Sequence, residues 1–161
     1  MTRAPLRAEI DAVNALVYAN INNGVYECGF ASSQAAYEEA FDALFAAMDE
    51  VERRLGQQRY LVGGRLTEAD QRLFTTLVRF DAVYVGHFKC NLRRMEDYPH
   101  LSNYLRELYH VPGIAETANM SHIKRHYYQS HESINSRRIV AKGPDLDFRR
   151  PHNRTRLAAV S

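Results

Sequence analysis

The 161-residue sequence has no tryptophan, only two cysteines (Cys28 and Cys90), and no apolar run that approaches the roughly 20 residues of a membrane span. The cysteines form no Cys-x-x-Cys pair, which favours a reducing cytoplasm over a disulfide framework. The first residues lead directly into a helical pattern and lack the apolar core of a signal peptide. We therefore expect a cytoplasmic protein, of about one domain's length, with no membrane segment.

The familiar catalytic and metal-binding motifs are also missing: there is no P-loop, GxGxxG, GxSxG or HExxH. Isolated cysteines such as Cys28 and Cys90 are more often small buried residues than redox centres. His122 and His126 are four residues apart, with His131 beyond them, and this spacing can bind zinc. No cysteine or carboxylate nearby completes such a site, so we expect no metal.

Charge is distributed unevenly along the chain. Residues 1–135 contain 14 Lys and Arg against 17 Asp and Glu, a net charge of −3, whereas residues 136–161 contain 7 against 2, a net charge of +5. A basic tail can bind nucleic acid or an anionic surface, but it is more often solvated or docked on its own acidic body. We expect no nucleic-acid partner, a folded domain over 1–135 and an irregular basic extension over 136–161.

Apolar residues recur at helical spacing in five stretches, and no stretch shows the alternation of a strand, so we expect an all-α fold. The expected helices run from Pro5 to Ile21, from Ser32 or Ser33 to Leu55, from Thr67 to Tyr84, from Pro99 to Leu108 and from Ser121 to Tyr128. Gly24 is expected to cap the first helix and Gly56 to stop the second. Residues 25–31 are expected to form a loop and 57–65 a connector.

The start of the third helix gives the sharpest local signal. In Leu66-Thr67-Glu68-Ala69-Asp70, Thr67 occupies the N-cap position and Asp70 lies three residues later. This is a capping box with Asp in place of Glu or Gln, in which each side chain can satisfy an unpaired backbone N–H. Glu68 and Asp70 also favour the positive end of the helix dipole.

Ten tyrosines make up most of the aromatic content. Four lie within helical periodicity and are expected in the core or at its edge: Tyr18, Tyr37, Tyr104 and Tyr109. Three others lie elsewhere: Tyr26 follows Gly24, Tyr84 lies where the third helix loses its pattern, and Tyr127 lies on the last helix. A phenol suits a half-wet cleft as well as a core, so the residues alone leave both interpretations open for these three.

Several strings together resemble the C-terminal domain of Xi-class glutathione transferases, the glutathionyl-hydroquinone reductases. The resemblance covers about residues 6–153. The Thr67–Asp70 cap is common to glutathione transferases at large, whereas the strings around Tyr26 and Tyr84 are specific to the Xi class. The strings are Asn-Asn-Gly-Val-Tyr-Glu-Cys-Gly-Phe (22–30), Leu-Thr-Glu-Ala-Asp (66–70), Leu-Val-Arg-Phe-Asp-Ala-Val-Tyr-Val-Gly-His-Phe-Lys-Cys (77–90), Pro-Gly-Ile-Ala-Glu-Thr (112–117) and His-Ile-Lys-Arg-His-Tyr-Tyr (122–128).

The resemblance implies a glutathione-transferase C-terminal-type helical bundle that packs beside a thioredoxin-like domain and forms a homodimer. It also implies glutathione as co-substrate and glutathione conjugates of quinones and hydroquinones as substrates. In the family, a cysteine thiolate attacks the sulfur of a glutathionyl-hydroquinone, and a second glutathione resolves the mixed disulfide. By matching strings, the hydroquinone-site tyrosines fall on Tyr26, Tyr84 and Tyr127.

The chain departs from the family pattern in one respect that concerns the chemistry. The family's nucleophile lies in a Cys-Pro motif of the N-terminal domain, and this sequence contains neither that motif nor a thioredoxin-like pattern. Met1–Pro5 resembles a new start just before the first helix, so we expect a truncated product. We expect no catalytic residue in this chain and no activity from it alone.

Two hypotheses follow. In the first, the chain is the substrate-binding and dimerisation domain of a glutathionyl-hydroquinone reductase. In the second, it is a non-catalytic helical protein-interaction module derived from such a domain.

Overall fold

The computed structural model describes residues 4–157, without the side chains of residues 4–6. Every regular element within this range is helical, which confirms the all-α prediction. The first three residues of the expected new start at Met1–Pro5 and the last residues of the extension, 158–161, lie outside the described residues. The helices are α1 (Ala4–Val17), η1 (Tyr18–Asn22), α2 (Gly24–Gly29), α3 (Gln34–Gln57), α4 (Glu68–Arg79), η2 (Phe80–Tyr84), η3 (Met95–Asp97), α5 (Pro99–Tyr109), η4 (Ala115–Thr117), α6 (Met120–Ser130) and η5 (Arg154–Arg156).

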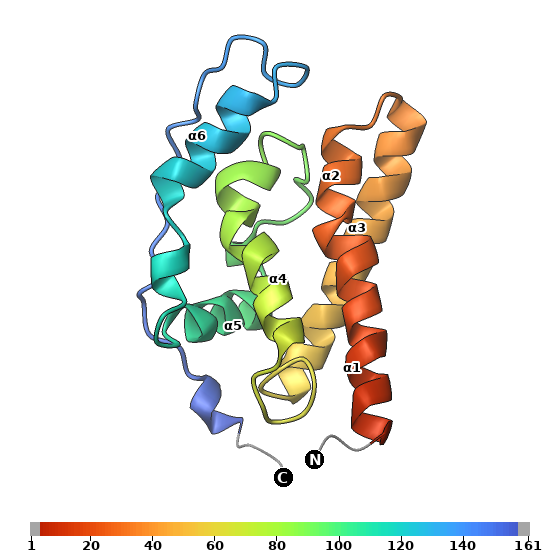
Figure 1. The fold of residues 1–161 in the computed structure, drawn as a ribbon, viewed down its shortest axis with the longest axis vertical. Helices are drawn as coiled ribbons and strands as arrows, with labels where there is room; N and C mark the ends of the chain where they lie inside the picture. Colours follow the sequence, from red (N-terminus) through yellow and green to blue (C-terminus); the bar gives the residue numbers. More distant parts are fainter. Residues whose placement is uncertain (1–3, 158–161) are drawn as a thin grey trace.

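Helix α4 lies at the centre of the bundle (Figure 1). On one side lie α1, α2 and the long α3, with α2 packed along α3 and α1 against α4. On the other side lies α6, while α5 crosses near one end. The apolar stripes that the sequence predicts for its second, third and fourth helices lie on α3, α4 and α5 and face this centre. Their fully buried members include Leu44, Met48 and Leu55 of α3, Leu73 and Leu77 of α4, and Leu101, Tyr104 and Leu108 of α5.

The prediction of a loop over residues 25–31 was wrong. Gly24 does not cap the first helix but begins α2, where it is buried against Leu44 of α3. The chain passes from α1 through a π-helical turn, in which the N–H of Asn23 donates to the carbonyl of Tyr18 at 2.9 Å. Burial of Val25 and Cys28 against the bundle offsets the weak helix propensity of the glycine.

Other helix ends were predicted with mixed success. Ser33 caps α3 by accepting a hydrogen bond from the N–H of Ala36 at 3.1 Å. Gly56 does not stop α3, which continues to Gln57; a side chain at Gly56 would lie 2.9 Å from the ring of His100. The cap of α6 is Asn119, not Ser121, because the Asn119 side chain accepts from a backbone N–H of the first turn.

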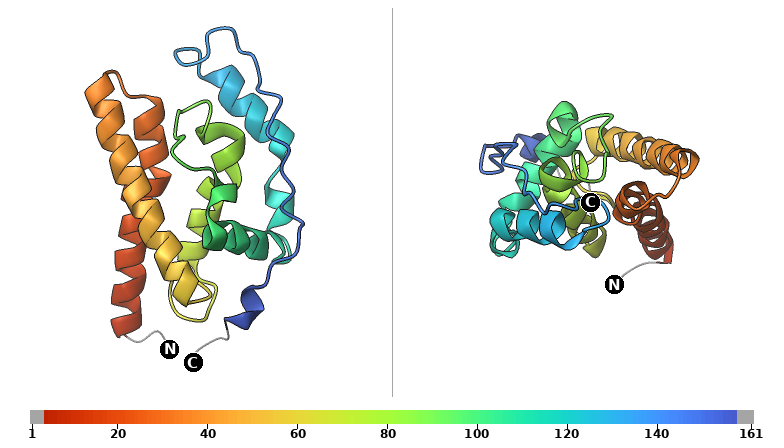
Figure 2. Two further views of the ribbon diagram at one scale, coloured as in Figure 1. Left: turned by 180° about the vertical axis from the view of Figure 1, so that it is seen from behind. Right: turned by 90° about the horizontal axis from the view of Figure 1, so that it is seen from above.

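The basic extension docks on the body rather than extending into solvent. It runs along α6 and α5 to η5 (Figure 2). There the Arg154 side chain is fully buried and donates to the backbone carbonyls of Leu55 and Arg59 at 3.1 and 2.7 Å. Arg154 also lies 3.4 Å from the carboxylate of Glu107 and over the ring of Tyr104. The extension thereby supplies a donor to a carbonyl in the last turn of α3 and to one just beyond the helix.

The capping box at Thr67 and Asp70 is confirmed, and Asp70 does more than cap the helix. Its carboxylate is fully buried and accepts from the N–H of Thr67 at 2.9 Å, the N–H of Leu61 at 3.0 Å and the hydroxyl of Tyr104 at 2.6 Å. Burial raises the pKa of Asp70, and these hydrogen bonds oppose the increase. One side chain therefore ties the connector, the start of α4 and α5 together.

Replacing Asp70 with Ala should lower the free energy of unfolding by about 3 kcal/mol or more, because three donors in or beside the core lose their acceptor at roughly 1–3 kcal/mol each. The urea midpoint measures this loss. Glu68→Ala is the matched control, since Glu68 lies in the same first turn but is exposed. Equal midpoints for the two variants would contradict the assigned role of Asp70.

Candidate functional site

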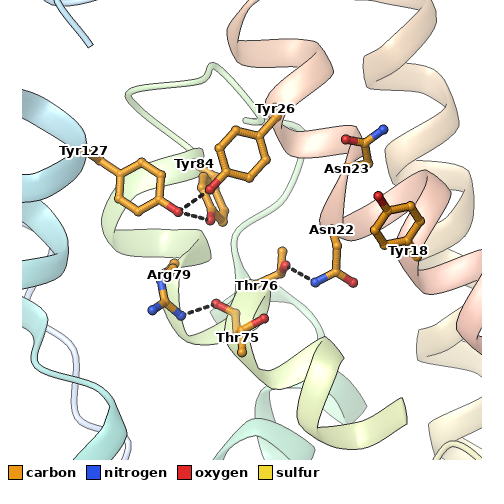
Figure 3. Close-up of a pocket in the computed structure, with 9 residues that line it drawn as sticks. All are labelled: Tyr18, Asn22, Asn23, Tyr26, Thr75, Thr76, Arg79, Tyr84 and Tyr127. Atoms are coloured by element: carbon orange, nitrogen blue, oxygen red, sulfur yellow. Dashed lines mark hydrogen bonds between the residues drawn. The ribbon is translucent and has the colours of Figure 1, made fainter. Parts of the chain in front are cut away.

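The structure brings together the three tyrosines that the sequence singled out. The Tyr127 hydroxyl lies between the other two, 2.5 Å from the hydroxyl of Tyr26 and 2.8 Å from that of Tyr84 (Figure 3). Tyr26 comes from α2, Tyr84 from the end of η2 and Tyr127 from α6. The cluster therefore forms where three separate parts of the chain meet.

Two π-helical turns direct side chains to this meeting point. The turn η1 precedes α2 and sets the entry of the helix that carries Tyr26. The turn η2 extends α4 and contains Tyr84, closed by a hydrogen bond from the N–H of Val85 to the carbonyl of Phe80 at 3.0 Å. π-Helical turns are rare in proteins overall, but those that occur often lie at functional sites. The extra residue in the turn changes the direction of the side chains that follow.

The hydroxyls of the tyrosine cluster have a limited supply of hydrogens. Each phenol carries one O–H, and the two hydrogen bonds through Tyr127 use two of the three hydrogens. One hydrogen is left to donate to a ligand. Tyr84 is 2% exposed and Tyr127 7%, whereas Tyr26 is 38% exposed, so Tyr26 is the member that meets solvent.

Burial keeps the two inner phenols protonated. It raises the pKa of Tyr84, and the hydrogen bond with Tyr127 acts in the same direction. Burial also raises the pKa of Tyr127 to about 12. At neutral pH these hydroxyls are therefore donors and acceptors of hydrogen bonds, not phenolates.

The cluster forms one end of a pocket of about 400 Å³ between η1, α2, α4 and α6. This volume suits a single aromatic ring with substituents. Its lining is Tyr18, Asn22, Asn23, Tyr26, Thr75, Thr76, Arg79, Tyr84 and Tyr127 (Figure 3).

The expectation that Tyr18 lies in or beside the core was wrong, since it is 64% exposed at this pocket. It falls in the π-helical turn, next to the buried stripe of Val17 and Ile21 but outside it. Tyr104 is fully buried as expected, and Tyr37 and Tyr109 are partly buried beside the core.

An aromatic ring behind the cluster was not anticipated from the sequence. Phe88 is fully buried, stacks on Tyr84 at 5.3 Å between ring centroids and lies 5.4 Å from the ring of Tyr26. Gly29 allows this approach, because a Cβ there would lie 2.2 Å from the Phe88 ring. The close contact between Gly29 and Phe88 fixes the position of the Phe88 ring against Tyr26 and Tyr84. Gly29 and Phe88 are distant in sequence, so this contact can be recognised only in the folded structure.

The cysteines lie in the core, and His131 lies beside His87. Cys28 and Cys90 are buried and free, as expected of small apolar residues. The neighbouring Cys28 thiol and burial raise the pKa of Cys90, and Cys90 lowers the pKa of Cys28. His131 lies 3.1 Å from His87 between ring nitrogens.

Within the described part of the chain, no three His, Cys, Asp or Glu residues gather where they could hold a metal ion. Over the same residues, no helix is both long enough and apolar enough to span a membrane.

The raised phenol pKa values predict a pH dependence of stability. The folded state holds the Tyr127 proton more tightly than the unfolded chain does, where phenols ionise near pH 10. Stability from this difference is therefore fully present below about pH 10 and is lost as pH rises toward 12, by up to about 1.4 kcal/mol per pH unit. Tyr127→Phe should flatten the loss, as measured by urea midpoints from pH 8 to 11. An unchanged slope would contradict the shift.

Comparison with known proteins places this geometry in a family. The family model described as "Glutathione S-transferase, C-terminal domain" matches residues 34–107. The chain is 52% identical over 149 residues to glutathionyl-hydroquinone reductase YqjG of Escherichia coli, covering 92% of this chain and 45% of that protein. It is 57% identical over 141 residues to glutathionyl-hydroquinone reductase PcpF of Sphingobium chlorophenolicum, covering 88% and 45%.

Solved structures agree. The glutathione-bound structure of YqjG superposes with a TM-score of 0.92 at 51% identity, over 95% of this chain and 50% of that one. The Xi-class transferase of Natrialba magadii gives a TM-score of 0.93 at 50% identity, over 96% and 47%. The chain thus spans about half the length of the relatives it matches. Residues 34–107 match the glutathione S-transferase C-terminal domain family, and the chain is similar, over nearly its whole length, to glutathionyl-hydroquinone reductases and Xi-class transferases.

Proposed function

We propose that this chain supplies the hydroquinone-binding half of a glutathionyl-hydroquinone reductase active site. The convergence of the Tyr26, Tyr84 and Tyr127 hydroxyls at one end of a pocket of about 400 Å³ carries the proposal. Aromatic edges and faces accept a ring, while the one free hydroxyl hydrogen donates to a ring oxygen. A hydroquinone presents that combination of ring and oxygen.

The chemical step requires a thiol that this chain does not expose. In the proposed reaction, a cysteine thiolate of a thioredoxin-like partner domain attacks the sulfur of the glutathionyl-hydroquinone and forms a disulfide with it. The carbon–sulfur bond breaks, its electron pair stays on the ring carbon, and that carbon takes up a proton. A second glutathione then attacks the mixed disulfide, releasing glutathione disulfide and restoring the thiolate. Glutathione binds mainly to the partner domain, and we place the reaction in the cytoplasm.

Isolated and completed forms of the protein test this proposal. The isolated chain, mixed with a glutathionyl-1,4-hydroquinone and glutathione, should produce no glutathione disulfide, because Cys28 and Cys90 are buried. Joined to a thioredoxin-like domain that carries Cys-Pro, it should turn over. In that protein three single variants should each lower kcat: Tyr26→Phe, Tyr84→Phe and Tyr127→Phe. The loss should reach about a hundredfold for a hydroxyl that donates to developing negative charge, because such a donor is strongest where water is excluded. The triple change should cost more than any single one.

Tyr109→Phe is the matched control for this series. The Tyr109 ring packs on Phe148 at 5.5 Å between ring centroids, away from the tyrosine cluster. Tyr18 and Tyr104 are unsuitable, because Tyr18 lines the pocket and Tyr104 donates to Asp70. Full turnover in all three cluster variants, or an equal loss in Tyr109→Phe, would exclude the assignment of the three tyrosines. Absence of turnover in the completed wild-type protein would instead favour a helical interaction module without a substrate site.

We further propose a homodimer, as the resemblance to the Xi class implies. Phe30, Leu92 and Ile139 are large apolar side chains that are about half exposed or more, and they offer surface for a second copy. Light scattering of the isolated chain at tens of micromolar should give a mass about twice the 18.5 kDa of the monomer. A monomeric mass for both the isolated chain and the completed enzyme would contradict the dimer.

A further inference from the structure

Among the residues that the structure describes, Arg79 is the only charged side chain lining the pocket beside the tyrosine cluster. It is the last residue of α4, immediately before the turn that carries Tyr84, and it is partly buried. One of its N–H groups donates to the carbonyl of Thr75 at 2.7 Å (Figure 3). The backbone thus holds the guanidinium at the wall of the pocket.

No carboxylate within the described range forms an ion pair with Arg79, although seven such pairs are formed elsewhere, by Arg53, Arg54, Arg59, Arg93, Arg94, Arg150 and Arg154. An arginine side chain has five N–H hydrogens, and a single carbonyl oxygen can accept at most two of them. Arg79 therefore retains donors for a ligand after its bond to the Thr75 carbonyl. Its positive charge at the pocket is uncompensated by a neighbouring acid.

The charge of Arg79 reaches the hydroxyl cluster. Burial raises the pKa of Tyr127, and the positive charge of Arg79 acts in the opposite direction. Tyr127 is itself held in the protonated form by burial and by Tyr26. A ligand oxygen at the same end of the pocket experiences the same positive potential. Unlike the Tyr127 hydroxyl, it is not kept in its protonated form by burial in the core.

Resting on the proposed function, we propose that Arg79 makes this pocket selective for the phenolate form of a bound aromatic ring over the neutral phenol. The oxyanion accepts the free hydrogen of the tyrosine cluster and is balanced by the guanidinium. A cation within about 4–6 Å lowers the pKa of an acidic group by roughly 1–3 units, which is at least a tenfold preference for the ionised ligand. Arg79 is thus a specificity-determining residue of the pocket.

The test uses 4-nitrophenol, whose phenolate absorbs visible light, and its methyl ether 4-nitroanisole, which cannot ionise. Absorbance titration of 4-nitrophenol bound to the full chain should give an apparent pKa about one unit or more below that of the free compound. Arg79→Gln should abolish this shift, and Arg79→Lys, which keeps the charge, should retain most of it. Affinity for 4-nitroanisole should change by less than about twofold in Arg79→Gln.

Arg125→Gln is the matched control, because it removes the same charge from an exposed position on α6. Circular dichroism verifies that each variant is folded. Binding of both compounds with the same 4-nitrophenol pKa in wild type and Arg79→Gln would overturn the role of Arg79 and leave the aromatic pocket standing. An equal change in Arg125→Gln would also overturn it, since the effect would then be one of net charge. Binding of neither compound would overturn the pocket assignment together with the selectivity.

Discussion

The buried carboxylate of Asp70 is the contact on which the placement of α4 depends. It accepts hydrogen bonds from the connector at Leu61, from the N-cap at Thr67 and from Tyr104 of α5. A buried carboxylate is stable only when such donors surround it, so the three elements must assemble together. The far end of the same helix carries Arg79 and leads into the turn that contains Tyr84. A structural contact at one end of α4 therefore helps to fix the positions of Arg79 and Tyr84 at the other.

The tyrosine cluster illustrates how the fold produces a polar centre within an aromatic wall. Phe88 and Gly29 position the rings by close packing, and the hydroxyls meet because α6 brings Tyr127 between Tyr26 and Tyr84. Burial keeps the inner phenols neutral, so the cluster acts through hydrogen bonds and not through charge. The charge at the pocket comes from Arg79. Donor and cation are thus supplied by different side chains and can be altered separately.

The chain spans about half the length of its relatives. In the function proposed for it, this half binds the ring of the substrate and a thioredoxin-like half supplies the thiolate and binds glutathione. Its own thiols, Cys28 and Cys90, are enclosed in the core beside each other. Burial separates both thiols from solvent.

The sequence by itself determined the helical class, the long apolar stripes and the Thr67–Asp70 cap, because these depend on spacing along the chain and on local backbone hydrogen bonds. It also singled out Tyr26, Tyr84 and Tyr127, although without the resemblance their phenols fit a core as well as a cleft. Their convergence, the Phe88 wall and the charge of Arg79 depend on helices that are distant in sequence. The helix over Gly24–Gly29 and the exposure of Tyr18 were missed for a related reason. Packing against α3 and the π-helical turn η1 decided them, and neither leaves a periodic signal in the residues.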